Sequence, residues 1–230
     1  MSDRYYDTPR REILPWLPER VVRLLDVGCG SGATTAAVRD ARGVEWAGGI
    51  EFVDAVAERA EARFDRVWRG EAAKAPLEAE IPAGSLDLVL CLDVLEHMPD
   101  PWTMVRRLSR LIRPGGRLIL SVPNIRHWKF VWRLIARGDF TYRDAGLLDR
   151  THLRFFVRRT AIELATCGGL ELVAATSAQA WRFPEPRWWL ARLSAGKLDE
   201  VMAKQWLVVA QQPGGGLGAP PLPKGEVESA

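Results

Sequence analysis

Histidine and cysteine are scarce in this chain, with three of each among 230 residues. An odd number of cysteines, set far apart in apolar or glycine-rich surroundings, indicates neither a disulfide framework nor a zinc site. We therefore interpret Cys29, Cys91 and Cys167 as reduced packing residues. Three histidines also leave few side chains that change protonation near neutral pH.

Long apolar runs, internal repeats and a strong charge excess are lacking as well. No apolar run approaches the ~18 residues of a membrane-spanning helix. The N-terminus lacks the basic-then-apolar pattern of an export signal. The net charge is only +3, and a 47% apolar composition suffices for a sizeable core. We predict one cytoplasmic α/β domain over residues 1–212 and a disordered Pro/Gly-rich tail over residues 213–230.

The most informative segment runs from residue 21 to residue 35, where an apolar stretch ends on an acid and breaks into alternating glycines. This pattern predicts a strand, a tight loop and a helix N-terminus, where backbone N–H groups can approach a nucleotide-like cofactor. Gly28, Gly30 and Ala33 also satisfy a dinucleotide-binding fingerprint. Asp26 favours a ligand with an ammonium and a sulfonium instead. The run from Asp26 through Gly28, Gly30 and Gly32 resembles motif I of the class I S-adenosylmethionine (SAM)-dependent methyltransferases.

The resemblance implies further contacts to SAM downstream. Residues 44–50 predict a second strand ending at Glu51, about 20 residues past the loop, where an acid can accept both ribose hydroxyls. Phe52 is placed to lie on the adenine face, and Glu71 and Ala72 lie beside the adenine edge after a short third strand. The alternatives are a helix-start acid at Glu51 and a plain surface acid at Glu71.

Residues 85–101 resemble the fourth-strand motif of the same superfamily, and their Glu-His-Met-Pro-Asp-Pro ending is similar to the quinone-biosynthesis O-methyltransferases. We group Asp93, in this block, with the cofactor-binding residues. A helix over 102–112, a Pro-Gly-Gly stop and a fifth strand should follow. With strands over 170–176 and 205–210, we expect a Rossmann-like, seven-stranded, mainly parallel sheet with helices on both faces and an antiparallel last strand.

Basic charge is concentrated after the fifth strand, where residues 124–159 hold nine Lys/Arg and three Asp/Glu. We interpret residues 124–156 as an insertion at the acceptor site. A helix over 125–137 would place Ile125, Trp128, Trp132 and Ile135 on one face and four basic residues on the other. Such a helix fits a weak peripheral membrane contact, a substrate lid, a nucleic-acid surface or plain packing on its own domain.

Residues 146–156 are similar to a branch of bacterial methyltransferases linked with glycan, cell-surface or secondary-metabolite biosynthesis. His152 in this run is our first candidate for the base that deprotonates an acceptor hydroxyl, and His97 is the second. We interpret His127 as a solvated side chain. A histidine that braces the loop is the alternative for His152.

A metal site is a further option. Asp93, Glu96, His97 and His152 resemble the set that holds Mg²⁺ in small-RNA 2′-O-methyltransferases, with Glu96, His97 and His152 as the ligands here. The chain departs from that pattern by its Asp93, where those enzymes have Glu, and by lacking a second His after His97.

Three functions remain open. The first is SAM-dependent O-methylation of a small, glycan-like or lipid-linked hydroxyl compound. The second is RNA 2′-O-methylation, which the absence of an RNA-binding domain disfavours. The third is a non-catalytic, SAM-binding partner in a biosynthetic complex. Residues 181–190 would cover the acceptor, and Tyr5, Tyr6 and Arg10 would close over the methionine end of SAM. The sequence does not indicate an oligomeric state.

Overall fold

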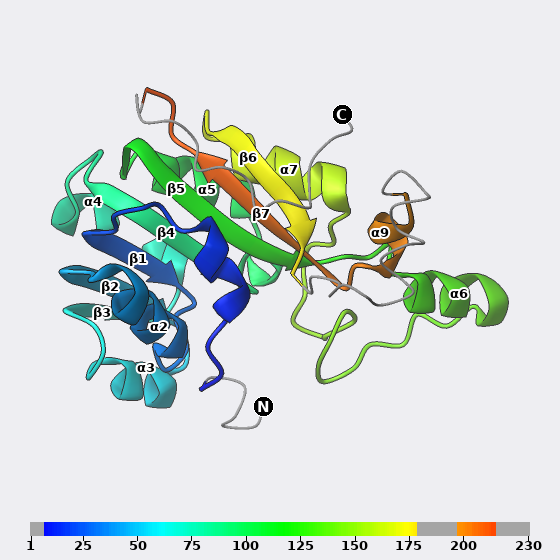
Figure 1. Cartoon of the computed structure of the whole chain (residues 1–230). Coiled ribbons are helices and arrows are strands. Elements are labelled where there is room, and N and C mark those ends of the chain that lie inside the picture. Colours follow the sequence, from blue (N-terminus) through cyan, green and yellow to red (C-terminus); the bar gives the residue numbers. More distant parts are fainter. Residues whose placement is uncertain (1–6, 179–196, 215–230) are drawn as a thin grey trace.

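A seven-stranded sheet forms the centre of the molecule in a computed structural model that describes residues 7–178 and 197–214 (Figure 1). The strands are β1 (Arg23–Val27), β2 (Trp46–Glu51), β3 (Arg66–Arg69), β4 (Leu86–Leu92), β5 (Ile112–Pro123), β6 (Glu171–Ser177) and β7 (Gln205–Gln211). Their order in the sheet is β3-β2-β1-β4-β5-β7-β6, and β7 runs antiparallel to both of its neighbours. The predicted mainly parallel sheet with an antiparallel last strand is confirmed.

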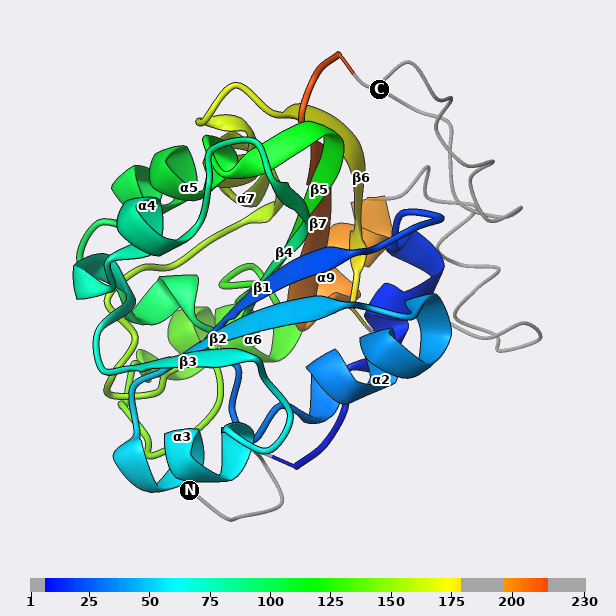
Figure 2. The same cartoon turned by 90° about the vertical axis from the view of Figure 1, so that its left-hand side faces the viewer.

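Helices cover both faces of this sheet (Figure 2). One face carries α4 (Leu77–Glu80), α5 (Pro101–Ser109) and α7 (Arg158–Thr166), and the other carries η1 (Arg11–Trp16), α2 (Ala33–Arg42) and α3 (Asp54–Ala60). The remaining helical elements are η2 (Ala72–Lys74), η3 (Leu95–His97), α6 (Trp128–Arg137) and α9 (Lys197–Met202). No helix in the described part of the chain is long and apolar enough to cross a membrane.

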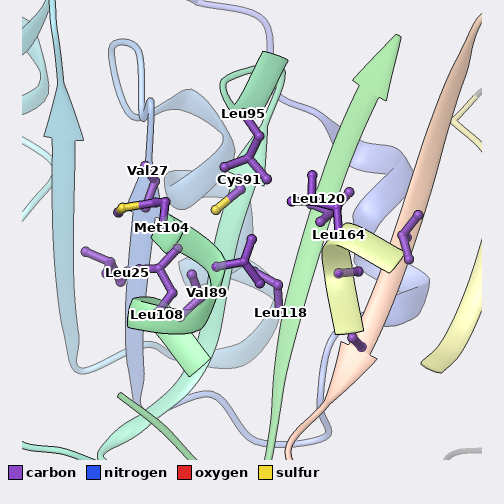
Figure 3. Packing of buried hydrophobic residues seen from close by; sticks show 14 of the residues in the cluster. Leu25, Val27, Val89, Cys91, Leu95, Met104, Leu108, Leu118, Leu120 and Leu164 are labelled. Carbon is purple, nitrogen blue, oxygen red and sulfur yellow. The ribbon is translucent and has the colours of Figure 1, made fainter. Parts of the chain in front are cut away.

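The core divides into two apolar layers because alternate residues of each strand point to opposite faces. Val89 and Cys91 of β4 meet Met104 and Leu108 of α5 on one face (Figure 3). Leu88 and Leu90 belong to the cluster on the other face, with residues of η1, α2 and α3. Burial on both faces explains why these strands read as nearly continuous apolar runs in the sequence.

Two boundaries differ from the prediction at the Pro-Gly-Gly segment. The helix expected to reach residue 112 ends at Ser109, and the segment expected to stop it lies inside β5. Ile112 pairs with Leu86, and the next pair joins Arg117 to Leu88, so the residues between form a bulge. Pairing with β4 therefore overrides the local turn signal.

The insertion also differs in detail. Its helix α6 begins at Trp128 rather than residue 125, because the Asn124 side chain accepts a hydrogen bond from the Arg126 N–H at 3.0 Å and forms a turn first. The only buried residue of α6 is Phe130, whereas Trp132 and Ile135 are 62% and 78% exposed. Plain packing of the predicted apolar face on its own domain is therefore wrong.

The strand order reverses between β1 and β4. Along the chain, β1 to β3 build the sheet outward in one direction, and β4 and β5 build it in the other. In open α/β sheets, ligands bind beyond the carboxyl ends of the strands at such a switch point. The ends of β1, β2 and β4 therefore mark where a functional site should be sought.

Candidate functional site

The loop between β1 and α2 takes the backbone conformation that its glycines predict. The φ angle is +74° at Gly28, +55° at Gly30 and +84° at Gly32, a region that L side chains rarely adopt. A Cβ atom at Gly28 would lie 2.9 Å from Val94, and one at Gly32 would lie 2.7 Å from the Phe64 ring. Space and conformation therefore both require glycine at these two positions.

Glu51, at the end of β2, joins the loop to the start of α3. One carboxylate oxygen accepts a hydrogen bond from the Gly30 N–H at 2.9 Å, and the other accepts one from the Val53 N–H at 2.9 Å. The residue is only 6% exposed. Each carboxylate oxygen can accept a further bond, so this arrangement presents two fixed acceptors of the kind that vicinal ribose hydroxyls require.

Asp26 is the penultimate residue of β1 and is buried. Its carboxyl accepts a hydrogen bond from Thr35 Oγ1 at 2.8 Å. Burial, together with the charge of Glu51, raises the pKa of Asp26 from 3.8 to about 7. A cationic ligand nearby would favour the ionised carboxylate and lower this pKa again.

The predicted adenine contacts are only partly brought together. Phe52, 69% exposed, and Glu71 line the same surface hollow of about 460 Å³ beside β3. The Glu71 carboxylate forms an ion pair with Lys74 at 2.8 Å, as a surface acid would. Ala72 does not line this hollow, and its carbonyl oxygen accepts a hydrogen bond from Arg107 at 3.3 Å.

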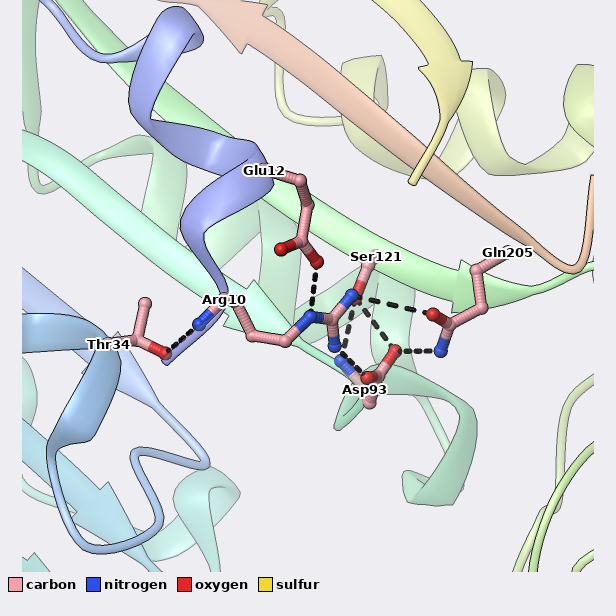
Figure 4. A network of polar contacts seen from close by, with 6 residues as sticks. All are labelled: Arg10, Glu12, Thr34, Asp93, Ser121 and Gln205. Atoms are coloured by element: carbon pink, nitrogen blue, oxygen red, sulfur yellow. Dashed lines mark hydrogen bonds and ion pairs between the residues drawn. The ribbon is translucent and has the colours of Figure 1, made fainter. Parts of the chain in front are cut away.

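Asp93, directly after β4, is the centre of a polar network (Figure 4). One of its oxygens accepts hydrogen bonds from Ser121 Oγ and Gln205 Nε2, both at 2.7 Å, and the other is paired with the Arg10 guanidinium. Asp93 has φ +55°, and it is the one non-glycine residue of the described chain with a positive φ. Arg10 also donates its backbone N–H to Thr34 at 3.1 Å. The network thus ties the N-terminal segment to β4, β5 and β7, while Tyr5 and Tyr6 lie outside the described residues.

His97 and His152 meet in a cavity of about 720 Å³ beyond the ends of β4 and β5. Their ring centroids are 4.7 Å apart and their planes are 70° from parallel. His152 comes from the loop after α6, as the sequence placed it, and His97 comes from η3. The structure therefore brings together two base candidates that are 55 positions apart in the sequence.

In both histidine rings, Nδ1 is the nitrogen that forms a hydrogen bond within the protein. His152 Nδ1 lies 3.1 Å from the Leu147 carbonyl oxygen, which can only accept, so Nδ1 carries the proton. Thr151 Oγ1 donates to Asp149 at 2.6 Å and therefore accepts from His97 Nδ1 at 3.0 Å. Nε2 of each neutral ring keeps its lone pair. Burial, followed by the neighbouring His152, lowers the pKa of His97 below its usual value, which favours the neutral form.

Glu96 completes this group from the same 3₁₀ turn as His97. It is 1% exposed, and its Oε2 atom has no hydrogen-bond partner within the described chain. Burial, together with the charge of Asp93, raises the pKa of Glu96 well above its usual value. Ligand atoms of Glu96, His97 and His152 all lie within 4.8 Å of one another. An unpartnered carboxylate oxygen beside two imidazole lone pairs fits a divalent cation.

Some residues that line the cavity were not predicted from the sequence. His127 lines it and is partly buried, so its interpretation as a solvated side chain is wrong. Arg143 and Lys204 also line it, from the loop before His152 and from the residue before β7. The basic excess of residues 124–159 was the available signal for Arg143, whereas nothing near Lys204 in the sequence indicated a role.

The sheet order, the glycine loop at the switch point and the acid Glu51 at the end of β2 are together typical of the class of SAM-dependent methyltransferases. A family model described as a methyltransferase domain matches residues 2–205. The chain belongs to this family of methyltransferases, and SAM is its cofactor.

Known proteins agree with this assignment. The chain is 32% identical to the ubiquinone biosynthesis O-methyltransferase of Pseudomonas aeruginosa (strain UCBPP-PA14), over 74% of this chain and 82% of the relative. Its fold is similar to a chain in the complex of the Haloferax volcanii Trm112 methyltransferase activator with a methyltransferase, with TM-score 0.62, 18% identity and 92% of each chain covered. A SAM-dependent methyltransferase from Mesorhizobium loti aligns with TM-score 0.59 and 18% identity, covering 90% of this chain and all of that one. The two structural matches establish the fold alone.

Proposed function

We propose that this methyltransferase transfers the methyl group of SAM to a hydroxyl of a small, glycan-like or lipid-linked acceptor bound in the 720 Å³ cavity. The observation that carries the proposal is the pair of imidazoles, His97 and His152, whose Nδ1 atoms are held by hydrogen bonds, so that Nε2 of each ring is left to accept a proton. An oxygen nucleophile must lose a proton during the transfer, and this pair provides the acceptor. The likeness to a ubiquinone biosynthesis O-methyltransferase of Pseudomonas aeruginosa supports O-methylation.

The chain's own residues would do five things in this reaction. Glu51 would accept the ribose hydroxyls, and the glycine loop, which carries no side chains at residues 28, 30 and 32, would let the cofactor lie against the backbone. Asp26 lies behind the loop and compensates a cationic charge. Phe52 and the hollow beside β3 receive the adenine. His152 Nε2 takes the hydroxyl proton while the hydroxyl oxygen bonds to the methyl carbon and the carbon–sulfur bond breaks, with S-adenosylhomocysteine as the product.

A divalent cation at Glu96, His97 and His152 is part of the proposal. When bound, it would polarise the acceptor hydroxyl and lower the pKa of that hydroxyl. Two imidazoles and one carboxylate form a donor set that Mn²⁺, Fe²⁺ or Zn²⁺ accept more readily than Mg²⁺, which prefers oxygen ligands. With a cation in place, His152 acts as its ligand, and the proton leaves a more acidic hydroxyl.

The test begins with labelled SAM and fractionated cell extract, to find which fraction takes up label. With that acceptor, His152→Ala should lower the turnover rate by ~100-fold or more, as loss of a base does, while the affinity for S-adenosylhomocysteine stays unchanged. Arg150→Ala, at an exposed position in the same loop, is the matched control. Unchanged turnover of the His152 variant, with only its thermal stability lowered, would leave His152 as a brace of the loop. Label in RNA instead would favour 2′-O-methylation of RNA.

A chelator distinguishes the two roles of His152. If the wild-type protein loses activity on chelation and regains it with Mn²⁺ or Mg²⁺, Glu96, His97 and His152 hold a metal. Full activity after chelation and dialysis would assign His152 the role of base alone.

We also propose that α6 makes a weak and reversible contact with a membrane surface. Trp132 and Ile135 are largely exposed, and Trp128 on the same face is 43% exposed. Exposed tryptophans on one helical face are typical of interfacial helices. Such a contact would bring a lipid-linked acceptor to the cavity, which α6 lines from its opposite side through Lys129, Phe130 and Arg133.

A further inference from the structure

Three cations line the cavity without a carboxylate partner in the described part of the chain. Lys129 comes from α6, Arg143 from the loop after it, and Lys204 from the residue before β7. Lys129 lies over the Trp128 ring, 5.6 Å from its centroid, so its contact is with an aromatic face and not with a carboxylate. The fourth cation of the lining, Arg133, is paired with Asp139 at 2.7 Å and so differs from these three.

The acids of the same cavity do not neutralise them. Asp93 is paired with Arg10, and Asp144 is paired with Arg150 at 3.1 Å. Glu96 is buried and lies with His97 and His152, since ligand atoms of these three residues are all within 4.8 Å of one another. The fourth acid, Asp149, accepts the hydrogen bonds of Thr151 and lies near the two histidines of the site. None of these four acids forms an ion pair with Lys129, Arg143 or Lys204 in the described part of the chain.

His127 lines the same cavity near two of these cations, Lys204 and Lys129. Burial lowers the pKa of His127, and the next two causes are the charges of Lys204 and Lys129. Two lysines from segments 75 residues apart in the chain thus act on one point of the cavity. Two positively charged side chains from separate segments thus line one cavity, as in sites that bind anions.

We propose that Lys129, Arg143 and Lys204 form a subsite for a phosphoryl group carried by the methyl acceptor. This inference rests on the proposed function, because it places the acceptor in the cavity beside His97 and His152. Three cations suit the two or more negative charges of a phosphate or diphosphate better than the single charge of a carboxylate. A cavity of about 720 Å³ is large enough for a sugar or similar small acceptor with such a group. The acceptor class is then a phosphorylated hydroxyl compound.

The subsite can be tested with inorganic diphosphate as the probe. Titration calorimetry of the protein saturated with S-adenosylhomocysteine should show diphosphate binding. Lys204→Gln, Arg143→Gln and Lys129→Gln should each weaken this binding by about tenfold, as expected for loss of one hydrogen bond from a cation to an anion. Arg137→Gln is the matched control, because Arg137 is an exposed cation of α6 that does not line the cavity. Acetate should bind far more weakly than diphosphate.

Several outcomes overturn the inference. One is the absence of diphosphate binding, and another is an equal loss in the three variants and the control, which would show nonspecific attraction. A third concerns phospholipid headgroups: if Lys204→Gln reduces co-sedimentation with phosphatidylglycerol vesicles but leaves diphosphate binding intact, the cations serve a membrane. If the three variants lose affinity for S-adenosylhomocysteine instead, the cations bind the cofactor's carboxylate.

The same titrations separate this inference from the proposed function. Affinity for S-adenosylhomocysteine in the wild-type protein tests cofactor binding alone, and the His152 variant tests the chemical step. Loss of diphosphate binding in the three variants, with both of those results unchanged, supports the subsite specifically. Failure of the subsite with cofactor binding and turnover intact leaves a methyltransferase with a neutral acceptor.

Discussion

Replacement of Glu51 by Gln should weaken cofactor binding through one pair of atoms, the two carboxylate oxygens. In the structure both carboxylate oxygens accept backbone N–H groups, from Gly30 and from Val53, each at 2.9 Å. A glutamine keeps one oxygen, and its NH₂ group must face one of these N–H donors, so that one backbone donor loses its partner. The same NH₂ group can no longer accept a ribose hydroxyl.

The expected loss follows from these atoms. One hydrogen bond to a charged acceptor is removed and the other becomes neutral, which together should cost about 2–4 kcal/mol of binding free energy, or roughly 30- to 700-fold in Kd. The unpaired backbone donor should separately lower the free energy of unfolding by about 1–3 kcal/mol. These two effects need separate measurements, because one concerns the ligand and the other the fold.

Titration calorimetry with S-adenosylhomocysteine measures the first effect, at a temperature where circular dichroism shows the variant to be folded. Thermal unfolding measures the second. Glu58→Gln is the matched control, because Glu58 is an exposed acid on the nearby helix α3. A folded Glu51→Gln variant that binds S-adenosylhomocysteine within about threefold of the wild type would refute the ribose role. Glu51 would then be a residue that only holds the loop against α3.

Three further predictions concern other parts of the molecule. Because burial raises the pKa of Asp26 from 3.8 to about 7, its contribution to stability should be fully present below pH 3.8 and lost as the pH rises through about 7; Asp26→Asn should flatten the dependence of Tm on pH over that window, and an unchanged profile would contradict the shift. Thr151→Val removes the hydroxyl that accepts from His97 Nδ1, so the acidic limb of the pH–rate profile should move while S-adenosylhomocysteine affinity stays constant; Thr151→Ser should restore the profile, and a profile that does not move would exclude a positioning role. Trp128→Ala with Trp132→Ala should reduce co-sedimentation with anionic vesicles without lowering Tm, since both side chains are exposed; equal sedimentation of variant and wild type would leave α6 without a membrane role.

The sheet and the cofactor loop could be predicted because their signals are local. An apolar run followed by glycines at 28, 30 and 32 requires neighbouring residues only, and Glu51 follows from the length of one helix and one strand. The same holds for His152 and His97, which stand in runs with a recognisable pattern. Their roles stay predictions, as do the domain limits at residues 212 and 213.

What could not be predicted depends on partners far away in the chain. The Pro-Gly-Gly segment has every local feature of a helix stop, yet pairing of Ile112 with Leu86 makes it part of a strand. In α6 the buried side is the one that carries Phe130, whose ring lies 5.6 Å from that of Phe140, and not the predicted apolar face with Trp132 and Ile135. Lys204 enters the cavity only because β7 returns to the sheet beside β5.

The position of β7 has a consequence for synthesis of the protein on the ribosome. The strand made last is not at the edge of the sheet but between β5 and β6, which it joins along seven and six residue pairs. Until residue 211 has been made, β5 has an unpaired edge of the kind that associates with other chains, and β6 has no neighbour. Gln205 also donates one of the hydrogen bonds that hold Asp93, so the polar network around Asp93 is complete only after residue 205 has been made. A chain arrested at residue 204 should therefore aggregate and fail to bind S-adenosylhomocysteine, which pulse-labelling with a release assay would show; binding by the arrested chain would mean that the first five strands form the site alone.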